Sequence, residues 1–159
     1  MFFKDGKPQS TVTDTHIRGF FGRYRFLSNF EVAPCTVDGY TYMSSEHAYM
    51  AQKTHEVYYK EELANNITLC SEARKFGQTI PLREDWNEAR YESMLKVLQA
   101  KFFQNPRLAA ELLDTGDKIL EETNYWKDTY WGVCNGIGES NLGKALMEVR
   151  TMLKESTKE

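Results

Sequence analysis

The chain has 159 residues, of which 41% are hydrophobic and 27% are charged, and its formal net charge is −3. A chain of this length can bury a substantial core, so residues 1–159 are expected to form a single domain without disulfide staples. The acidic balance argues against a protein that attracts nucleic acid through its total charge, but it leaves room for a local phosphate pocket.

The sequence predicts a cytoplasmic protein without a bound metal ion. It contains no apolar run long enough to cross a membrane, and its N-terminal segment lacks the apolar stretch of a signal peptide. Cys35, Cys70 and Cys134 are widely separated and never in a CxxC pair, which indicates free thiols in a reducing compartment. The histidines and cysteines also lack the spacing of a zinc site.

In chain order, the first predicted elements are short strands within residues 16–43, where apolar and polar residues alternate. Asp38-Gly39 has the composition of a hairpin turn inside this region. A helix is expected at 44–53, because Ser44 or Ser45 can accept a hydrogen bond from the first helical N–H groups. The later expected elements are helices at 56–65, 71–77, 85–104, 107–114 and 141–154, a strand at 118–123, and a structured loop at 124–140.

The helix at 44–53 has a mixed face. At about 100° per residue, Glu46 and Lys53 lie on the same side as Tyr49 and Met50. Two interpretations are open at this point. The face is a solvated edge, or it presents a reactive carboxylate and a helper amine to a cleft.

The helix at 85–104 places two cations inside its apolar arc. Arg90 and Lys101 fall on the side that also carries Trp86. A buried, unpaired cation costs several kcal/mol, so each needs a carboxylate partner or an anionic ligand. The alternative is a structural ion pair or a side chain that extends its charged end to solvent.

Two loops carry polar and glycine residues that a core does not require. Ser28 and Asn29 lie in the first loop, where they either bind a ligand or cap a neighbouring helix. The glycine-rich segment 135–144 leads into a helix, an arrangement that can offer backbone N–H groups to a phosphate.

Four segments together resemble the NADAR, or YbiA-like, family: FFGRYRFLSNF, SSEHAYMAQK, the long stretch from DWNEARYESMLKVLQAKFF to LDTGDKILEET, and DTYWGVCNGIGESNLGKALMEVR. They cover nearly all of residues 16–153, the expected domain core, in the family's order and spacing. The resemblance implies an α+β fold, predominantly helical with a small antiparallel β-sheet, and a site that requires no metal or cofactor.

The resemblance also implies an N-glycosidase acting at C1 of a phosphorylated ribose. The expected substrates are aminopyrimidine ribotides of the riboflavin pathway, which would yield ribose 5-phosphate and the free base. One alternative is removal of ADP-ribose from guanine in nucleic acid. A second is a non-catalytic module that binds NAD or ADP-ribose, for which Glu46 would be dispensable.

Breaking this bond develops positive charge on the sugar and negative charge on the departing base. Glu46 is the candidate for the carboxylate near C1, and Asp128 is the second, unless its side chain only forms an Asx turn. Lys53 is expected either to pair with phosphate or to form a Schiff base with the open sugar, with Lys101 as the competing amine.

The expected substrate-binding residues form a larger set. The two indoles would stack on the base, and the arginines would hold phosphate. The set comprises Ser28, Asn29, Arg23, Arg74, Trp86, Arg90, Trp131, Gly132 and Asn141. Asn141 could instead cap the last helix, and Glu122, which matches a family position, could instead satisfy a buried cation.

Overall fold

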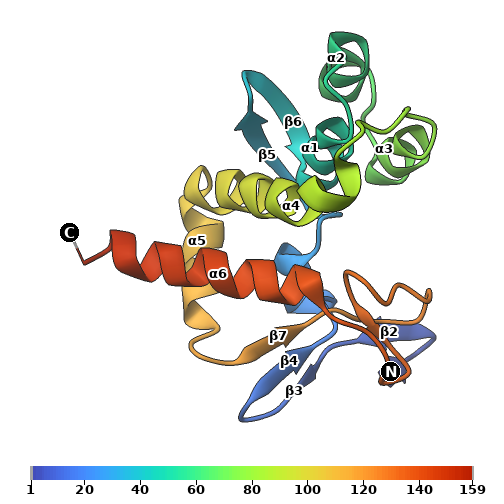
Figure 1. Cartoon of the computed structure of the whole chain (residues 1–159). Coiled ribbons are helices and arrows are strands. Elements are labelled where there is room, and N and C mark those ends of the chain that lie inside the picture. The colour runs from blue at the N-terminus through green and yellow to red at the C-terminus, as the bar shows by residue number, and fades with distance from the viewer. Residues whose placement is uncertain (1, 159) are drawn as a thin grey trace. The chain divides into compact units, whose positions relative to one another are not determined.

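The computed structural model describes residues 2–158, which fall into two compact units (Figure 1). Unit 1 combines residues 1–28 with 107–159, and unit 2 comprises residues 29–106. The expected organisation as one domain stays a prediction. None of the helices that the structure describes is long and apolar enough to span a bilayer.

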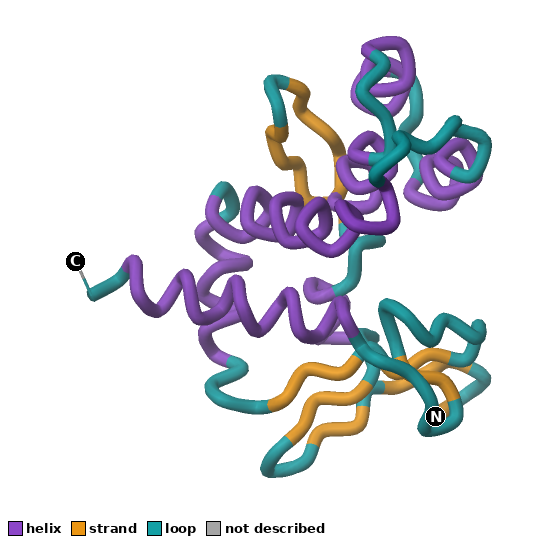
Figure 2. The backbone as a smooth tube through the Cα atoms, viewed as in Figure 1, coloured by secondary structure: helices purple, strands orange, loops and turns teal. Residues whose placement is uncertain are grey.

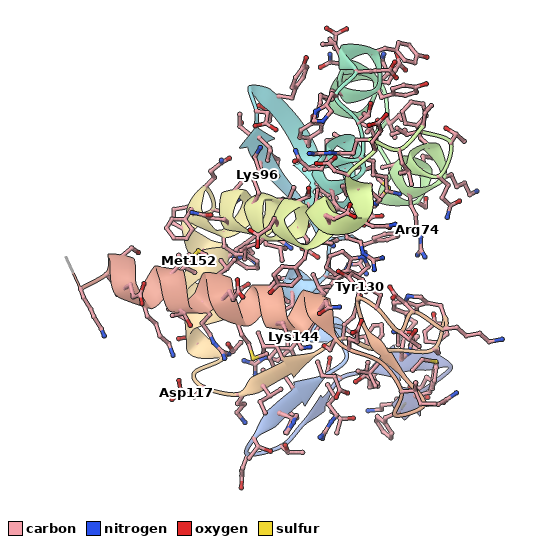
Figure 3. The ribbon with its side chains drawn as sticks, viewed as in Figure 1. Arg74, Lys96, Asp117, Tyr130, Lys144 and Met152 are labelled. Atoms are coloured by element: carbon pink, nitrogen blue, oxygen red, sulfur yellow. The ribbon has the colours of Figure 1, made fainter. Side chains whose placement is uncertain are left out.

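Unit 2 contains a two-stranded hairpin and four helices (Figure 1). Its elements are β5 (Val32–Val37), β6 (Tyr40–Ser44), α1 (Ser45–Gln52), α2 (Val57–Asn65), α3 (Cys70–Gly77) and α4 (Trp86–Phe103). The predicted hairpin turn is confirmed, because Asp38 and Gly39 both adopt positive φ values, of 53° and 85°. Lys96, labelled in Figure 3, lies on α4 and reaches this turn with its Nζ 2.6 Å from Oδ1 of Asp38.

The helix α1 is buried along its whole length. Ser44 caps it, because its side chain accepts a hydrogen bond from the backbone N–H of His47. All eight residues of α1 are buried, so the solvated-edge interpretation of its Glu46 face is wrong. α1 packs closely on α3, where a Cβ added to Gly77 would lie 2.0 Å from Sδ of Met50.

Unit 1 is built from short strands and two longer helices, as Figure 2 shows. Its elements are β1 (Phe2–Lys4), β2 (Lys7–Gln9), β3 (Thr11–Val12), β4 (His16–Arg18), the 3₁₀ helix η1 (Gly22–Leu27), α5 (Pro106–Asp114, whose first residue closes unit 2), β7 (Ile119–Glu121), β8 (Thr123–Asn124), β9 (Val133–Cys134) and α6 (Asn141–Ser156). The expected α+β class with small antiparallel sheets is confirmed, although β4–β7 and β8–β9 pair in parallel.

The helix α6 forms the core of unit 1 with β7. Leu142, Leu146 and Val149 are buried, as its predicted apolar stripe requires. Gly143 permits close packing, because a Cβ at this position would lie 1.9 Å from the backbone oxygen of Leu120 in β7. This contact fixes the first turn of α6 against the strand.

Candidate active site

Three charged residues of unit 2 gather at α1, and we call Glu46, Lys53 and Arg74 the α1 cluster. Glu46 lies in the first turn of α1 and is only 8% exposed. Burial lowers the pKa of Lys53, while the Glu46 carboxylate opposes this shift and the Arg74 guanidinium adds to it. Glu46 and Arg74 each lie within electrostatic reach of Lys53. Arg74, labelled in Figure 3, extends from α3 and is exposed.

The α1 cluster is accompanied by two packed aromatic rings. Tyr49 of α1 and Trp86 of α4 have ring centroids 5.4 Å apart and an interplanar angle of 47°. Both side chains are buried, and Arg90 follows Trp86 by one turn of α4 and is half-buried. The predicted face of α1 thus meets Trp86 of α4 through Tyr49, and Arg90 lies one turn further along α4.

Asn29 acts on the N-terminal end of α1. Its backbone oxygen accepts a hydrogen bond from the N–H of Glu46 at 3.2 Å, and its Oδ1 accepts one from Oγ of Ser45 at 2.7 Å. Asn29 therefore caps the first turn of α1 through its backbone oxygen, and its role in substrate binding stays a prediction. Because these bonds hold the turn that carries Glu46, Asn29 also positions the candidate carboxylate.

Lys101 has different surroundings from Lys53. Its side chain is completely buried in α4, and its Nζ lies 5.1 Å from the ring centroid of Phe102. Burial lowers its pKa to about 8, and the negative charge of Glu31 opposes this shift. It follows Trp86 by about four helical turns, or roughly 22 Å along α4. Lys101 and Trp86 therefore do not share a local environment, and the role of Lys101 as a reacting amine stays a prediction.

The loop between β8 and β9 of unit 1 carries Asp128, Trp131 and Gly132. Oδ1 of Asp128 accepts hydrogen bonds from the N–H groups of Tyr130 and Trp131, at 3.2 and 3.0 Å. This is the Asx turn that the sequence allowed. Gly132 lies in a crowded position, since a Cβ there would be 2.4 Å from Nδ2 of Asn124.

Asn124, which the sequence pattern did not single out, organises this loop. The side chain is 1% exposed, and its Oδ1 accepts hydrogen bonds from the N–H groups of Trp126 and Asp128 at 3.1 and 3.2 Å. Its Nδ2 donates to the backbone oxygen of Asp128 at 2.8 Å. An Asn placed at the start of a loop rich in polar residues is a signal for such turns.

The N-terminal end of α6 is held by hydrogen bonds to the preceding loop. The N–H groups of residues 139–142 donate to the backbone oxygens of residues 129–132 of the preceding loop. Asn141 adds a side-chain bond from its Nδ2 to the backbone oxygen of Tyr130 at 2.9 Å (Tyr130 is labelled in Figure 3). The N–H groups of residues 139–142 therefore already have backbone acceptors, and a phosphate site elsewhere in 135–144 stays a prediction.

The other candidates of unit 1 lie in η1 and β7–β8. Arg23 is exposed, with its guanidinium carbon 5.0 Å from the ring centroid of Tyr24. Ser28 ends η1 by donating its N–H to the oxygen of Arg25. Glu122 is half-buried beside Gly132. Among residues 2–158, no three His, Cys, Asp or Glu side chains are grouped to hold a metal ion, and the three cysteines are free thiols as predicted.

Several proteins that are similar in sequence to this chain are named as N-glycosidases or riboflavin biosynthesis proteins. The chain is 40% identical to an N-glycosidase YbiA of Shigella boydii and 39% identical to one of Escherichia coli, over 82% of each chain. A riboflavin biosynthesis protein of Vibrio vulnificus is 39% identical, over 82% of this chain and 36% of its own length. The NMR structure of Escherichia coli YbiA superposes with a TM-score of 0.83 at 36% identity, covering 95% of this chain and 92% of that one.

These relatives confirm the prediction of a hydrolase that acts on N-glycosyl bonds. The NADAR domain profile matches residues 14–154, and the chain belongs to the NADAR family.

Proposed function

We propose that this chain hydrolyses the C1–N bond of a phosphorylated ribosyl compound, with aminopyrimidine ribotides of the riboflavin pathway as its substrates. The proposal is supported by relatives named N-glycosidases and riboflavin biosynthesis proteins. The observation that carries it is the α1 cluster, where the buried Glu46 and the exposed Arg74 both act on the pKa of Lys53. Water adds its hydroxyl to C1, its proton goes to the departing base nitrogen, and ribose 5-phosphate and the free base result.

Glu46 supplies the carboxylate near C1 in this mechanism. Its position in a buried helical turn, fixed by Asn29 and Ser45, restricts its motion and excludes most water. A carboxylate so placed stabilises the positive charge that develops on the sugar and directs the attacking water. Arg74, which is exposed on α3, is suited to the 5-phosphate, because a guanidinium binds phosphate oxygens in pairs.

Lys53 has two roles that the structure supports. Burial favours its neutral amine, which can displace the base at C1, with the amine proton going to the base nitrogen. Ring opening then gives a Schiff base, which water hydrolyses to free Lys53 and ribose 5-phosphate. In its charged form it would pair with phosphate beside Arg74. Borohydride reduction during turnover separates these roles, since a Schiff base leaves a ribosyl adduct on Lys53 and phosphate pairing leaves an unmodified chain.

Asp128 is the second carboxylate of the proposal. Its Oδ1 holds the Asx turn, so a chemical role falls to its Oδ2. Asp128→Asn preserves a side-chain oxygen for the turn and removes the charge. Loss of turnover with unchanged stability supports the chemical role, and unchanged turnover shows that Asp128 serves only the turn.

The substrate is tested by incubating the purified chain with the aminopyrimidine ribotide and, in parallel, with ADP-ribosylated DNA. We expect free base and ribose 5-phosphate to appear in the first reaction, detected by chromatography and mass spectrometry. Release of ADP-ribose from the DNA without turnover of the ribotide would overturn the proposed substrate while leaving the bond type unchanged. Binding without turnover of either compound would contradict the enzyme assignment.

A further inference from the structure

Gly77, the last residue of α3, lies where the backbone conformation does not require a glycine. Its φ is not among the positive values in the chain, so an alanine can adopt the same conformation. Alanine also favours a helix more than glycine does. Gly77 is buried, and the reason for a glycine is therefore expected in the packing around it.

Met50 of α1 fills the space beside Gly77. A Cβ on residue 77 would lie 2.0 Å from Sδ, 2.6 Å from Cγ and 3.0 Å from Cβ of Met50. Sδ is at the flexible end of the side chain, but Cβ is fixed by the α1 backbone, and Met50 is only 5% exposed. A side chain at residue 77 would therefore push α3 away from α1, and Figure 1 shows these two helices side by side.

The close packing of α1 and α3 brings a backbone acceptor to the amine of Lys53. Nζ of Lys53 donates a hydrogen bond to the backbone oxygen of Gly77 over 3.5 Å. This distance lies at the upper limit for a hydrogen bond, so even a small separation of the two helices breaks it. The bond therefore depends on the absence of a side chain at Gly77.

The backbone of Lys53 is fixed by hydrogen bonds to other segments than α3. Its N–H donates to the oxygen of Met50 at 3.2 Å, and its oxygen accepts the N–H of Arg83 at 2.8 Å. These bonds tie Lys53 to α1 and to the segment before α4, so its backbone does not follow a movement of α3. The position of α3 against α1 thus decides whether the Lys53 amine keeps its hydrogen-bond acceptor.

We propose that Gly77 is a positioning residue for Lys53, an inference that rests on the proposed function of Lys53 as the amine that displaces the base at C1. A neutral amine carries two N–H groups and one lone pair. When one N–H is donated to the Gly77 oxygen, the lone pair stays available for C1 and the amine is held in a restricted orientation. The amine proton still goes to the base nitrogen, so the Gly77 oxygen orients the nucleophile without taking up a proton.

The hydrogen bond is tested without any turnover by NMR of the backbone carbonyl carbons in the full chain. Lys53→Met removes the donor, so the Gly77 carbonyl signal is expected to shift in the direction of a lost hydrogen bond and the Ala51 signal to move much less. Lys60→Met is the matched control, because Nζ of Lys60 donates to the backbone oxygen of Ala51 at 2.9 Å. It is expected to shift the Ala51 signal and leave the Gly77 signal in place.

The effect on the reaction is tested by the kinetics of ribotide turnover. Gly77→Ala is expected to lower kcat by about tenfold to a hundredfold, because the amine loses its orientation. KM should change little, since Arg74 is exposed and its long side chain accommodates a small shift of α3. Met50→Ala/Gly77→Ala removes the atoms that clash and is expected to recover most of the loss in kcat. Leu63→Ala, a cavity in the core of unit 2, is the control for lowered stability and should keep kcat per folded molecule.

Three results overturn the proposal: an unmoved Gly77 carbonyl signal in Lys53→Met, full kcat in Gly77→Ala, or a rise in KM alone in Gly77→Ala. If Gly77→Ala does not fold, the double variant with Met50→Ala decides, and a folded double variant with kcat as low as that of Lys53→Met also overturns the proposal. Absence of turnover by the unchanged chain contradicts the proposed function instead, while the carbonyl signal still decides whether Gly77 holds the amine.

Discussion

Two lysines of unit 2 lie at the C-terminal ends of helices that pack on each other, and their surroundings differ. Lys53 ends α1, is half-buried, and lies near a buried carboxylate and an exposed arginine. Lys101 is near the end of α4, is fully buried, and is surrounded by Glu31 and two thiols. Both have lowered pKa values, yet only Lys53 has solvent access. A perturbed pKa therefore identifies a chemical site only when a substrate can reach the group.

The different roles of Lys53 and Lys101 are tested most strongly by replacing each side chain with an isosteric apolar one. Lys53→Met is expected to lower ribotide turnover by about a hundredfold or more, because the reacting or phosphate-binding charge is removed. A fall in kcat indicates the Schiff base, and a rise in KM alone indicates phosphate binding. Lys101→Met is the matched control and should retain turnover per folded molecule. Inactivation by Lys101→Met with intact folding would reverse the assignment.

The burial of Lys101 predicts a stability change at alkaline pH. Its pKa of about 8 in the folded chain lies below the value near 10.4 of the unfolded chain. Between these two pH values the unfolded chain binds more protons than the folded chain. The free energy of unfolding therefore increases as pH rises from about 8 towards about 10.4, and this increase is lost again as pH falls back through about 8. The gain amounts to about 3 kcal/mol at most. Urea unfolding of the unchanged chain and Lys101→Met from pH 7 to 10 measures it, and a constant difference between them contradicts it.

A smaller effect is expected at the start of α1, where His47 is buried as a neutral ring. Its Nδ1 lies 2.6 Å from Oγ of Ser44 and its Nε2 lies 3.0 Å from the backbone oxygen of Ile67. Burial lowers the pKa of His47, so the unfolded chain takes up the proton first as pH falls. Stability at α1 should therefore decrease below about pH 6.5. In His47→Gln, the free energy of unfolding measured with urea should decrease less steeply below about pH 6.5. An unchanged decrease would show that another group causes it.

The elements of unit 2 were predictable from sequence because local signals agree with the tertiary structure. Ser44 caps α1 and Asp38-Gly39 turns the hairpin, as these residue types predict. Unit 1 was less predictable. The hairpin β1–β2 and the 3₁₀ helix η1 were missed, since three-residue strands and a single tight helix carry almost no periodic signal.

The sequence predicted which residues belong to the candidate site, but it did not predict their burial or their neighbours. Glu46 and Lys53 share a face by helical geometry alone, and Trp86 meets that face through Tyr49. The same geometry grouped Lys101 with Trp86, because angular position on a helix says nothing of distance along its axis. The hydrogen bonds at the start of α6 were also not predictable, since the acceptors of the N–H groups of residues 139–142 lie eight to eleven positions earlier in the chain.

The role of Glu46 in catalysis is tested most directly by single-turnover cleavage of the aminopyrimidine ribotide by the Glu46→Gln variant. The control is the Glu92→Gln variant, because Glu92 is exposed on α4. Both substitutions remove one carboxylate charge and keep the side-chain shape. The account predicts that Glu46→Gln slows cleavage by about a hundredfold or more while remaining folded, and that Glu92→Gln cleaves at the unchanged rate. Cleavage by Glu46→Gln at the full rate would contradict the assignment of the reaction to the α1 cluster.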